Sequence, residues 1–301
     1  DERPRFLQGI LMDITEQKKL EQMQSAIYSI ANAALEAEEL NDLYQSIHSI
    51  LDMLFPVKNI FIAIYDEKNN TFEFPFFIDE FDENPGRTKA QGSLTRYVFE
   101  TGRSLLVTPD LFRKMSRKGM LKSIGKPSLD WMGVPLKVNG KPYGVLAVQT
   151  YIRNIRYGQD ELDMMNFVST QIGMAVSRKL TEDQLQESEK RYRGVFDGVR
   201  EASFIESTNG RMLDVSESAC RMFGYSRDDM LKLMVYDLVP PGTQGIKAED
   251  LINTKEPGKP LEWVNVRANG EIFPVELSAR IHEIDGEEVV LEICDLVLQW
   301  K

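Results

Sequence analysis

A long stretch without helix breakers lies near the middle of this chain and constrains its fold more than any other feature. Between Met174 and Arg193 there is no glycine or proline. Because these two residue types end or weaken helices, we expect one continuous helix over residues 159–196. Strand-rich sequence lies on both sides of it. A chain of 301 residues is long enough for two domains of common size, so we expect two domains joined by a helix.

The first half of the chain combines helices with two strand hairpins. Thr15 is expected to cap the first helix, and Pro56 is expected to end the second. The pair Asn139-Gly140 lies between two apolar runs and is a strong signal for a hairpin turn. The expected elements are helices at 16–35, 40–55 and 94–102 and strands at 59–66, 71–77, 131–138 and 141–151.

The second half begins with short elements and ends in a strand meander. Ser226, with Asp229 three residues later, resembles a capping box at the start of a short helix. Asn-Gly at 269–270 and Asp-Gly at 285–286 separate the last three strands, which predicts antiparallel neighbours. The expected elements are helices at 216–223 and 226–233 and strands at 202–207, 211–215, 261–268, 271–284 and 287–297. The predicted fold class is α+β, with two domains that each have a central antiparallel sheet flanked by helices.

Composition and charge limit the classes of function. With 42% hydrophobic and 28% charged residues, the chain is typical of a globular protein. Its net charge of −11 would repel a phosphate backbone, so we expect no nucleic-acid partner. No apolar run reaches the roughly 18–20 residues of a membrane span, and the first residues do not form a signal peptide. Together with only two cysteines, these features predict a cytoplasmic protein without direct membrane insertion.

The residues that usually carry catalysis or metal binding are scarce. The sequence has no Walker phosphate loop and no G-x-G-x-x-G or G-x-S-x-G motif. Its two histidines lie in different predicted domains. His48 is expected at the surface or edge of a helix, whereas strand parity places the apolar residues of 273–281, Ile281 included, on the core face and His282 on the outer face. We therefore predict no catalytic residue, no metal site and no haem ligand.

The cysteines and the charged segments are expected to be chemically quiet. Cys220 is interpreted as a small buried hydrophobic residue. Cys294 alternates with Ile293 in the last strand and is expected to face outward. Neither has a second cysteine or an activating base nearby in the sequence, which argues against a redox role. We expect the acidic segment 77–84 to be a solvated loop and the basic segment 113–122 to be a solvated amphipathic helix.

Aromatic residues are the remaining candidates for a small-molecule pocket. Such side chains fill cores by default, but they also line ligand pockets, and the sequence leaves both interpretations open. The candidates in the first domain are Phe72, Phe74, Phe76, Tyr97 and Trp131. The candidates in the second domain are Phe204, Phe223, Tyr225, Trp263 and Phe273.

Residues 24–178 resemble a GAF domain. Residues 59–83 are similar to the paired central strands of GAF sensors from bacterial multi-domain signalling proteins. Residues 93–108 resemble the family pattern G-L-x-x-x-V-x-x-T-G-x-x-L-x-V. Residues 130–151, DWMGVPLKVNGKPYGVLAVQTY, resemble its W-x-G-V-P-L and G-V-L-x-V-Q strands. The resemblance covers nearly the whole first domain.

Residues 188–298 resemble a PAS domain, on the segments 188–199, 209–231 and 268–296. Two positions depart from the family pattern: Ser216 replaces a common Asn, and Lys232 replaces a Gly.

Residues 6–15 resemble the closing strand and D-I-T tail of a preceding PAS domain. The expected organisation is the C-terminal strand of a preceding PAS-like domain at 1–15, a linker or first helix at 16–35, a GAF-like domain at 24–178, a helical linker at 179–191 and a PAS-like domain at 192–298.

The resemblance implies a sensory role and names no cofactor. Tetrapyrrole-binding GAF domains and GAF methionine-sulfoxide reductases use cysteines, and residues 24–178 contain none. The N-K-x-F-D-E pattern of cyclic-nucleotide GAF domains and the flavin-type PAS motif with a reactive Cys are also missing. The ligand is therefore left unknown, with no covalent tetrapyrrole, flavin–thiol or haem site.

We expect a non-catalytic sensory module that relays a signal through helical linkers to an output domain outside this sequence. The resemblance implies a bacterial or archaeal multi-sensor parent, with a histidine kinase first and a diguanylate cyclase second as the output. An irregular apolar seam on the long helix is compatible with a parallel homodimer; its members are Ile172, Val176, Leu180, Leu185, Tyr192 and Phe196. The expected trigger is a ligand or a protein partner that changes the packing of a domain on its flanking helices, and an unidentified small molecule is one candidate. The alternative is a dimerisation or protein-interaction scaffold whose pockets are closed.

Overall fold

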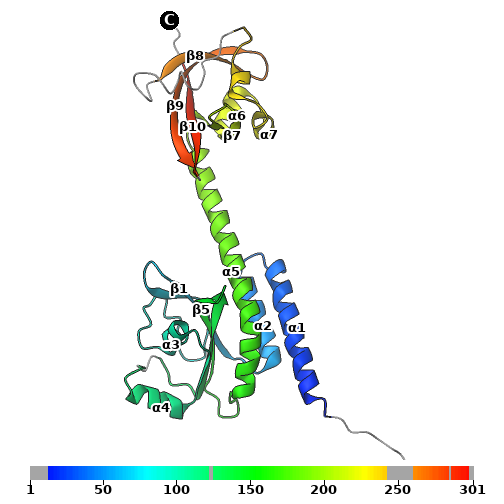
Figure 1. Cartoon of the computed structure of the whole chain (residues 1–301), viewed down its shortest axis with the longest axis vertical. Helices are drawn as coiled ribbons and strands as arrows, with labels where there is room; N and C mark the ends of the chain where they lie inside the picture. The colour runs from blue at the N-terminus through cyan, green and yellow to red at the C-terminus, as the bar shows by residue number, and fades with distance from the viewer. Residues whose placement is uncertain (1–12, 122–124, 243–259, 285, 298–301) are drawn as a thin grey trace, which may run out of the picture. The chain divides into compact units, whose positions relative to one another are not determined.

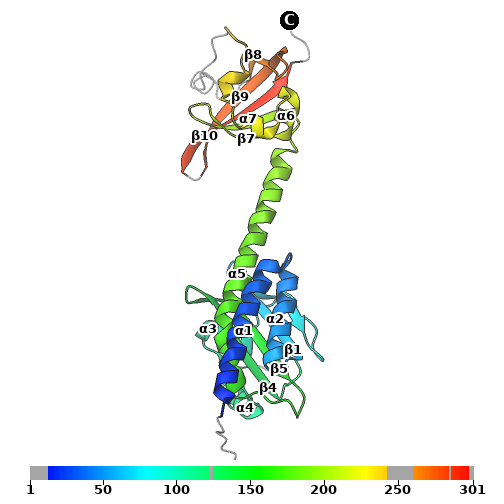
Figure 2. The same ribbon diagram turned by 90° about the vertical axis from the view of Figure 1, so that its right-hand side faces the viewer.

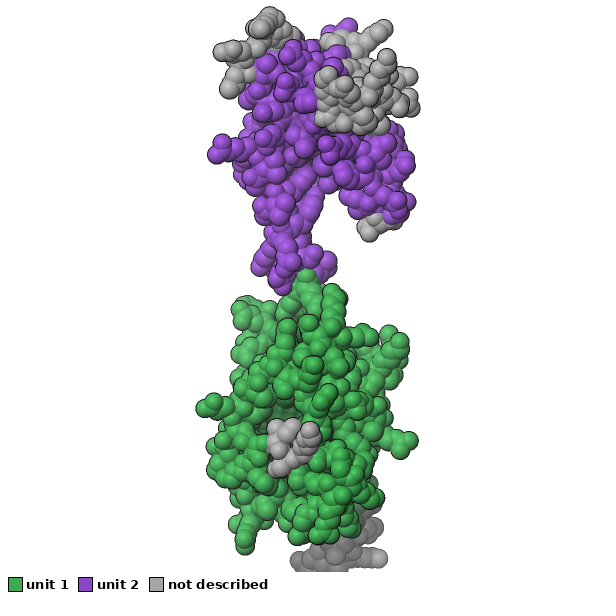
Figure 3. Space-filling view, turned by 90° about the vertical axis from the view of Figure 1, so that its left-hand side faces the viewer, with its two compact units in different colours: residues 1–184 green, residues 185–301 purple. Residues whose placement is uncertain are grey.

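The computed structural model describes residues 13–121, 125–242, 260–284 and 286–297 of the chain. The expected strand of a preceding domain, at 1–15, falls almost wholly outside these ranges, as does Asp285 of the last predicted turn. Two compact units make up the chain, residues 1–184 and residues 185–301 (Figure 3). Each unit has its own five-stranded antiparallel sheet and its own core. The predicted α+β fold class, with a long helix between two sheets, is confirmed.

Unit 1 has helices on one face of its sheet and a layer of short helices and loops on the other (Figure 1). The strand order is β2-β1-β5-β4-β3. Its elements are α1 (Thr15–Glu36), α2 (Leu40–Leu54), β1 (Asn59–Asp66), β2 (Thr71–Ile78), α3 (Leu94–Thr101), β3 (Leu105–Val107), α4 (Pro109–Arg117), β4 (Asp130–Val138), β5 (Lys141–Thr150) and the first part of α5 (Gln159–Phe196).

Short-range hydrogen bonds fix where the helices of unit 1 begin and end. Ser93 accepts a hydrogen bond from the N–H of Arg96 at the start of α3, and Gly102 ends that helix in the left-handed conformation at φ 60°. The predicted cap at Thr15 is wrong. Thr15 is itself the first residue of α1, and its N–H donates to the carboxylate of Asp13 at 2.9 Å. An aspartate two residues earlier therefore supplies the acceptor.

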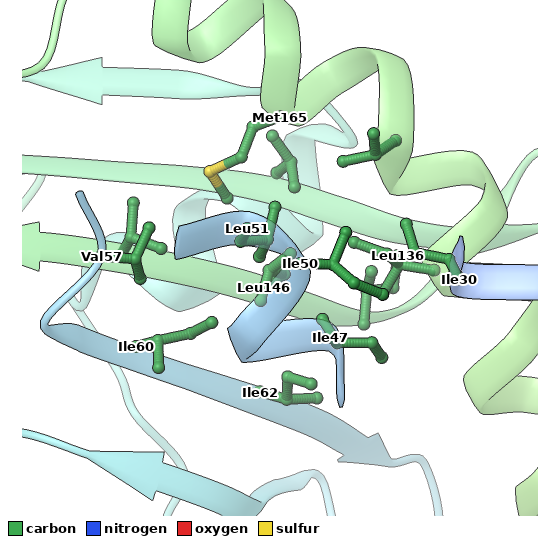
Figure 4. Close-up of a cluster of buried hydrophobic side chains, with 14 of the residues drawn as sticks. Ile30, Ile47, Ile50, Leu51, Val57, Ile60, Ile62, Leu136, Leu146 and Met165 are labelled. Carbon is green, nitrogen blue, oxygen red and sulfur yellow. The ribbon is translucent and has the colours of Figure 1, made fainter. Parts of the chain in front are cut away.

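The larger core of unit 1 lies between the sheet and helices α1, α2 and α5. Figure 4 shows side chains of α2 and Met165 of α5 together with those of the strands. Burial of a side chain such as Leu51 stabilises the fold by about 1.5–3 kcal/mol. Helix α5 approaches β4 so closely that a Cβ on Gly173 would lie 3.1 Å from the backbone nitrogen and oxygen of Lys137. The glycine therefore sets the packing distance between this helix and the sheet.

A β-bulge in β2 changes which face of the sheet its side chains occupy. Ile62 pairs with Phe76, whereas Ile64 pairs with Glu73, so β2 carries one extra residue over this stretch. Pro75 lies within it, on a strand at the edge of the sheet, where its missing N–H is tolerated. Side-chain alternation is reversed after the bulge. Phe74 therefore belongs to the smaller core beneath α3, and Phe76 belongs to the larger core beneath α2.

Unit 2 contains the end of α5 and a sheet in the order β7-β6-β10-β9-β8. Strands β9 and β10 form a hairpin that extends beyond the other strands of this unit (Figure 2). Ser216 and Ser226 cap the two short helices by accepting hydrogen bonds from Ala219 N and Asp229 N. The elements after α5 are β6 (Ala202–Ser207), β7 (Met212–Val215), α6 (Glu217–Phe223), α7 (Arg227–Met230), the short 3-10 helix η1 (Val235–Leu238), β8 (Leu261–Val266), β9 (Ile272–Ile284) and β10 (Glu287–Leu296).

Side-chain parity in the last hairpin is only partly as predicted. In β9 the odd-numbered residues 273–279 are buried, and His282 is exposed, as expected. Ile281 was expected in the core but is 44% exposed. Among the described residues, β8 pairs with β9 only as far as Leu277, so no strand covers Ile281 on that side.

Cys294 was expected to face outward, and that prediction is wrong. Its side chain is fully buried in the core of unit 2. Cys294 pairs with Leu277, and Glu292 pairs with Ala279. Directly paired residues of antiparallel strands point to the same face, so both residues of β10 share the core face of β9.

Candidate functional site

Three of the five candidates in the first domain meet on the face of the sheet beneath α3. Phe72, Phe74 and Trp131 are buried there. A Cβ on Gly133 would overlap the ring of Trp131, so the glycine two residues along β4 makes room for the indole. Phe76 lies on the other face because of the bulge in β2, so it cannot line the same surface. Tyr97 of α3 is half-buried.

The aromatic rings on this face pack mainly against one another. The centroids of Phe61 and Phe74 are 5.6 Å apart, and those of Phe72 and Phe99 are 5.3 Å apart at a 90° interplanar angle. The guanidinium of Arg96 lies 5.3 Å from the ring of Phe72 and donates to the backbone oxygen of Lys89. Close packing of this kind fills space with the protein's own side chains.

The acidic segment 77–84 is more ordered than the solvated loop that we expected. The carboxylate of Asp79 accepts hydrogen bonds from Gln149 Nε2 at 2.5 Å and Tyr151 Oη at 3.2 Å, and from the backbone of Phe81 and Asp82. Burial and the charge of Asp79 raise the pKa of Tyr151. These contacts attach the segment to the end of β5.

All five candidates in the second domain belong to one core cluster. Phe204, Phe223 and Phe273 are buried, and Tyr225 and Trp263 pack against them half-buried. The ring of Phe223 contacts both other rings edge-on, with centroids 5.5 Å from Phe204 and 5.3 Å from Phe273. The residues come from β6, α6, β8 and β9 and the segment after α6, so the fold brings together positions up to 69 residues apart (273 − 204).

Two glutamates that were not among the predicted site residues lie on the core face of the same sheet. Glu206 of β6 is 1% exposed, and Glu292 of β10 is 3% exposed. Oε2 of Glu206 has no hydrogen-bond partner in the described part of the chain. Burial and then the charge of Glu292 raise the pKa of Glu206 to about 8, and burial raises the pKa of Glu292. The correct pairing of β9 with β10 would have revealed Glu292, because that pairing places it opposite Ala279.

Asp214 of β7 ties the end of α5 to the PAS-like unit. Its carboxylate accepts hydrogen bonds from Tyr192 Oη at 2.7 Å and Arg193 Nη1 at 3.2 Å and forms an ion pair with Arg227. Burial opposes ionisation, but hydrogen bonds from Tyr192 and Arg193 and the charge of Arg227 hold the pKa of Asp214 below its ordinary value. Phe196, at the last position of α5, is buried. The last turn of the helix is therefore anchored by charge and by packing.

The histidines and cysteines do not assemble into a site. His48 is half-buried, and its Nε2 lies 2.8 Å from the backbone oxygen of Val57, so this nitrogen carries the proton. Cys220 is half-buried, and burial raises the pKa of its thiol. Sγ of Cys294 lies 3.9 Å from Sδ of Met222. Within the described ranges, no group of three or more His, Cys, Asp or Glu side chains could hold a metal ion.

No helix among the described residues is both long enough and apolar enough to cross a bilayer.

Comparisons with known proteins agree with the two sheets. Residues 37–177 match the GAF domain, and residues 200–295 match the PAS domain. The methyl sulfide methyltransferase-associated sensor of Methanosarcina acetivorans is 22% identical over 309 aligned residues, which cover 98% of this chain and 30% of that protein. Sporulation kinase E of Bacillus subtilis is 30% identical over 117 residues, covering 36% of this chain and 15% of that protein. The chain thus spans less than a third of either relative.

Solved structures of both kinds are also similar to parts of the chain. A GAF domain from a phosphoenolpyruvate-protein phosphotransferase of Coxiella burnetii is 13% identical, with 55% of this chain and 98% of that chain covered and a TM-score of 0.45. A PAS domain from a two-component sensor histidine kinase is 22% identical, with 37% and 98% covered and a TM-score of 0.33. The assignment rests on the sequence matches and on the two sheets: the chain carries a GAF domain followed by a PAS domain, both of the sensory type.

Proposed function

We propose that this chain is a non-catalytic sensory module whose helix α5 relays a change in either domain to an output domain of a longer signalling protein. A histidine kinase is the first candidate for that output, because one relative is a sporulation kinase. A diguanylate cyclase is the second. Within this proposal, the GAF-like region spans 24–178, the helical linker 179–191 and the PAS-like region 192–298. An unidentified small molecule is the proposed signal, and the proposed compartment is the cytoplasm.

One observation carries the proposal: the first part of α5 belongs to the core of one domain, and its last turn is bonded to the other. In unit 1, Met165, Val168, Ile172 and Val176 of α5 are fully buried against the sheet. In unit 2, Tyr192 and Arg193 of the same 38-residue helix bind Asp214. A change in packing at either end would act on the same continuous helix, which is what a helical relay requires.

Contacts with α1, with the loop after α1 and with β5 also hold the first part of α5. Lys179 Nζ donates to the backbone oxygens of Ala37 and Glu38 at 3.1 and 2.7 Å, and Tyr143 Oη donates to the oxygen of Gly173 at 2.6 Å. Lys19 of α1 pairs with Asp160 at 2.9 Å. Motion of α5 along its axis would break these directional bonds together. They therefore favour a relay with two discrete positions over continuous sliding.

The test changes the rotational phase of α5 at residues 184–190, which are exposed. Deletion of residues 184–190 removes seven residues and changes the phase by about 20°, whereas deletion of residues 184–188 removes five and changes it by about 140°. In the full-length parent, the seven-residue deletion should keep the signal response of the output. The five-residue deletion should lock the output on or off. Equal behaviour of the two deletions, whether active or inactive, would show that the phase of α5 does not transmit the signal.

The aromatic face beneath α3 favours a second function, that of a protein-contact scaffold, and this function would apply to the GAF domain and not to the PAS domain. Phe72 is fully buried among the rings of Tyr65 and Phe99, with Arg96 over it. A face filled in this way supports a domain that acts through protein contacts, in which case the scaffold alternative describes unit 1 and the signal enters through the PAS domain. A thermal-shift screen with metabolites separates the two functions. Stabilisation of unit 1 by any small molecule would contradict the scaffold.

A further inference from the structure

The glutamate pair in the PAS core is used neither by the relay nor by the aromatic cluster. Glu206 pairs directly with Val290 across β6 and β10, so it lies diagonally opposite Glu292 on the same face. Diagonal neighbours on adjacent strands are within reach of long side chains. The two carboxyl groups are therefore neighbours in a core from which water is excluded, since each residue is at most 3% exposed.

The side chains on the same face of the sheet are almost all apolar. The buried ones are Phe204, Met212, Leu277, Ala279 and Val290, together with the thiol of Cys294. Glu288 has the same parity on β10, but its side chain is exposed. At the neighbouring positions, Asp214, Arg280 and His282 have the opposite parity, so they belong to the other face.

The charged side chains of the helices that cover the sheet pair with groups other than Glu206 and Glu292. Glu217 and Arg221 of α6 pair at the surface, as do Asp229 and Lys232 after the start of α7, while Arg227 pairs with Asp214. The carboxylate of Asp237 in η1 accepts from the N–H of Met234. In the described part of unit 2, no ion pair reaches Glu206 or Glu292.

Two buried carboxylates without a cation cannot both be ionised at low cost, because burial and like charge each oppose ionisation. A single proton held between them removes one charge and supplies a hydrogen bond from Glu206 to Glu292. Oε2 of Glu206 has no hydrogen-bond partner among the described residues, so the surrounding side chains leave this oxygen unsatisfied. We propose that Glu206 and Glu292 form a proton-binding site in the PAS core and that ionisation of both carboxyls loosens the pairing of β6 with β10.

The sign of the effect follows from linkage. The carboxyls bind protons more tightly in the folded domain than in the unfolded chain. Between the ordinary carboxyl pKa of 4.5 and the raised value of about 8, the folded state therefore holds more protons than the unfolded state. The stability of unit 2 is greatest below this window and falls as the pH rises through it. Strand β6 is the first strand after α5, and β10 is the last described strand. Loosening of their pairing would therefore act beside the helix that the proposed relay uses, although proton binding does not depend on the relay.

The experiment measures thermal unfolding of the whole chain from about pH 5 to about pH 9. The variants are Glu206→Gln, Glu292→Gln and the control Glu287→Gln, whose side chain is exposed and has the opposite parity on the same strand. In the wild type, the midpoint of the unit 2 transition should fall across this range. Each core variant should remove about half of that fall or more, because the remaining carboxyl has no charged neighbour. The control should leave the fall unchanged.

A second readout separates proton binding from a purely structural effect of the substitutions. Infrared difference spectra between the two pH limits should show the carbonyl band of a buried protonated carboxyl in the wild type, and either core substitution should remove or shift it. A fall in midpoint that is the same in the wild type and both core variants would overturn the proposal, as would the absence of this band. Native mass spectrometry that finds an organic cation bound to the wild type and released by Glu206→Gln would also overturn it, because the pair would then be a ligand anchor.

Discussion

At the residue scale, Asp130 shows how much a buried charge in unit 1 depends on one partner. The Asp130 side chain is fully buried and accepts hydrogen bonds from Arg156 Nε and Nη2 at 2.6 and 2.8 Å and from the N–H of Tyr157 at 3.1 Å. Two parallel bonds from one guanidinium form a strong and directional pair. The pair fixes the segment that leads from β5 into α5.

We predict that Arg156→Gln destabilises unit 1 by about 2–3 kcal/mol, because it leaves a buried carboxylate without its cation. Urea denaturation followed by circular dichroism measures the change. Arg153→Gln is the control, since Arg153 is exposed on the same segment. Adding Asp130→Asn to the Arg156 variant should recover part of the lost stability, because the buried side chain is then uncharged. If Arg156→Gln is as stable as the control, solvent already satisfies Asp130.

Residue type alone indicated which aromatic side chains are buried, but it did not indicate which charged side chains are buried. The five PAS candidates meet in one core because large apolar side chains are buried wherever the sheet places them. Glu292 and Cys294 were missed because the face of a strand is decided by its pairing partner, and a shift of one residue reverses every side chain. Phe76 left its predicted group for a similar reason, through the extra residue in β2. Strand register is a tertiary property that local sequence specifies weakly.

At the element scale, α5 was predictable because an unbroken run of helix-forming residues leaves few alternatives. Helix α5 spans Gln159–Phe196, the same residues that the sequence predicts. Its apolar seam was less predictable. Ile172 and Val176 face the core of unit 1, whereas Leu185 is 69% exposed, so the predicted seam does not form one surface.

A glycine near the end of α5 gives a direct test of helix strength in this element. A Cβ on Gly194 would meet no atom within 4 Å, whereas a Cβ on Gly198, just beyond the helix, would lie 2.7 Å from the backbone oxygen of Gly194. We predict that Gly194→Ala stabilises unit 2 by about 0.5–1 kcal/mol, because alanine favours the helix and restricts the unfolded chain.

Gly198→Ala is the matched control and should destabilise unit 2, because the new methyl group overlaps the backbone. Thermal unfolding of both variants measures the difference. If the two alanines have the same effect, the end of α5 is not helical at Gly194 in solution.

At the scale of the whole molecule, the division into two units and the order of the two domains followed from local patterns, since each hairpin turn and each capped helix is specified by neighbouring residues. Local patterns do not predict whether two copies of the chain associate, because an apolar residue on the surface of one chain has the same local sequence whether or not a second chain covers it. We propose that the chain forms a homodimer through α5.

The support for a dimer is a stripe of large exposed side chains along one side of α5. Phe167, Met174, Leu185 and Tyr192 are each at least 39% exposed. Their spacings of 7, 11 and 7 residues are each close to a whole number of helical turns, so the four side chains align on one surface. Isolated exposed apolar residues are ordinary, but an aligned set on a long helix is typical of a helix pair.

The double variant Met174→Glu and Leu185→Glu places four new like charges in a two-chain interface and should shift the assembly to monomers. Light scattering at several protein concentrations measures the mass of the wild type and the variant. Gln184→Glu adds charge one position from Leu185, where the side chain lies off the stripe, and should leave the dimer intact. A wild type that stays monomeric at every concentration would contradict pairing through α5, and so would a double variant that keeps the mass of the dimer. In the first case α5 would have to relay its signal within a single chain, and in the second the dimer would form through another surface.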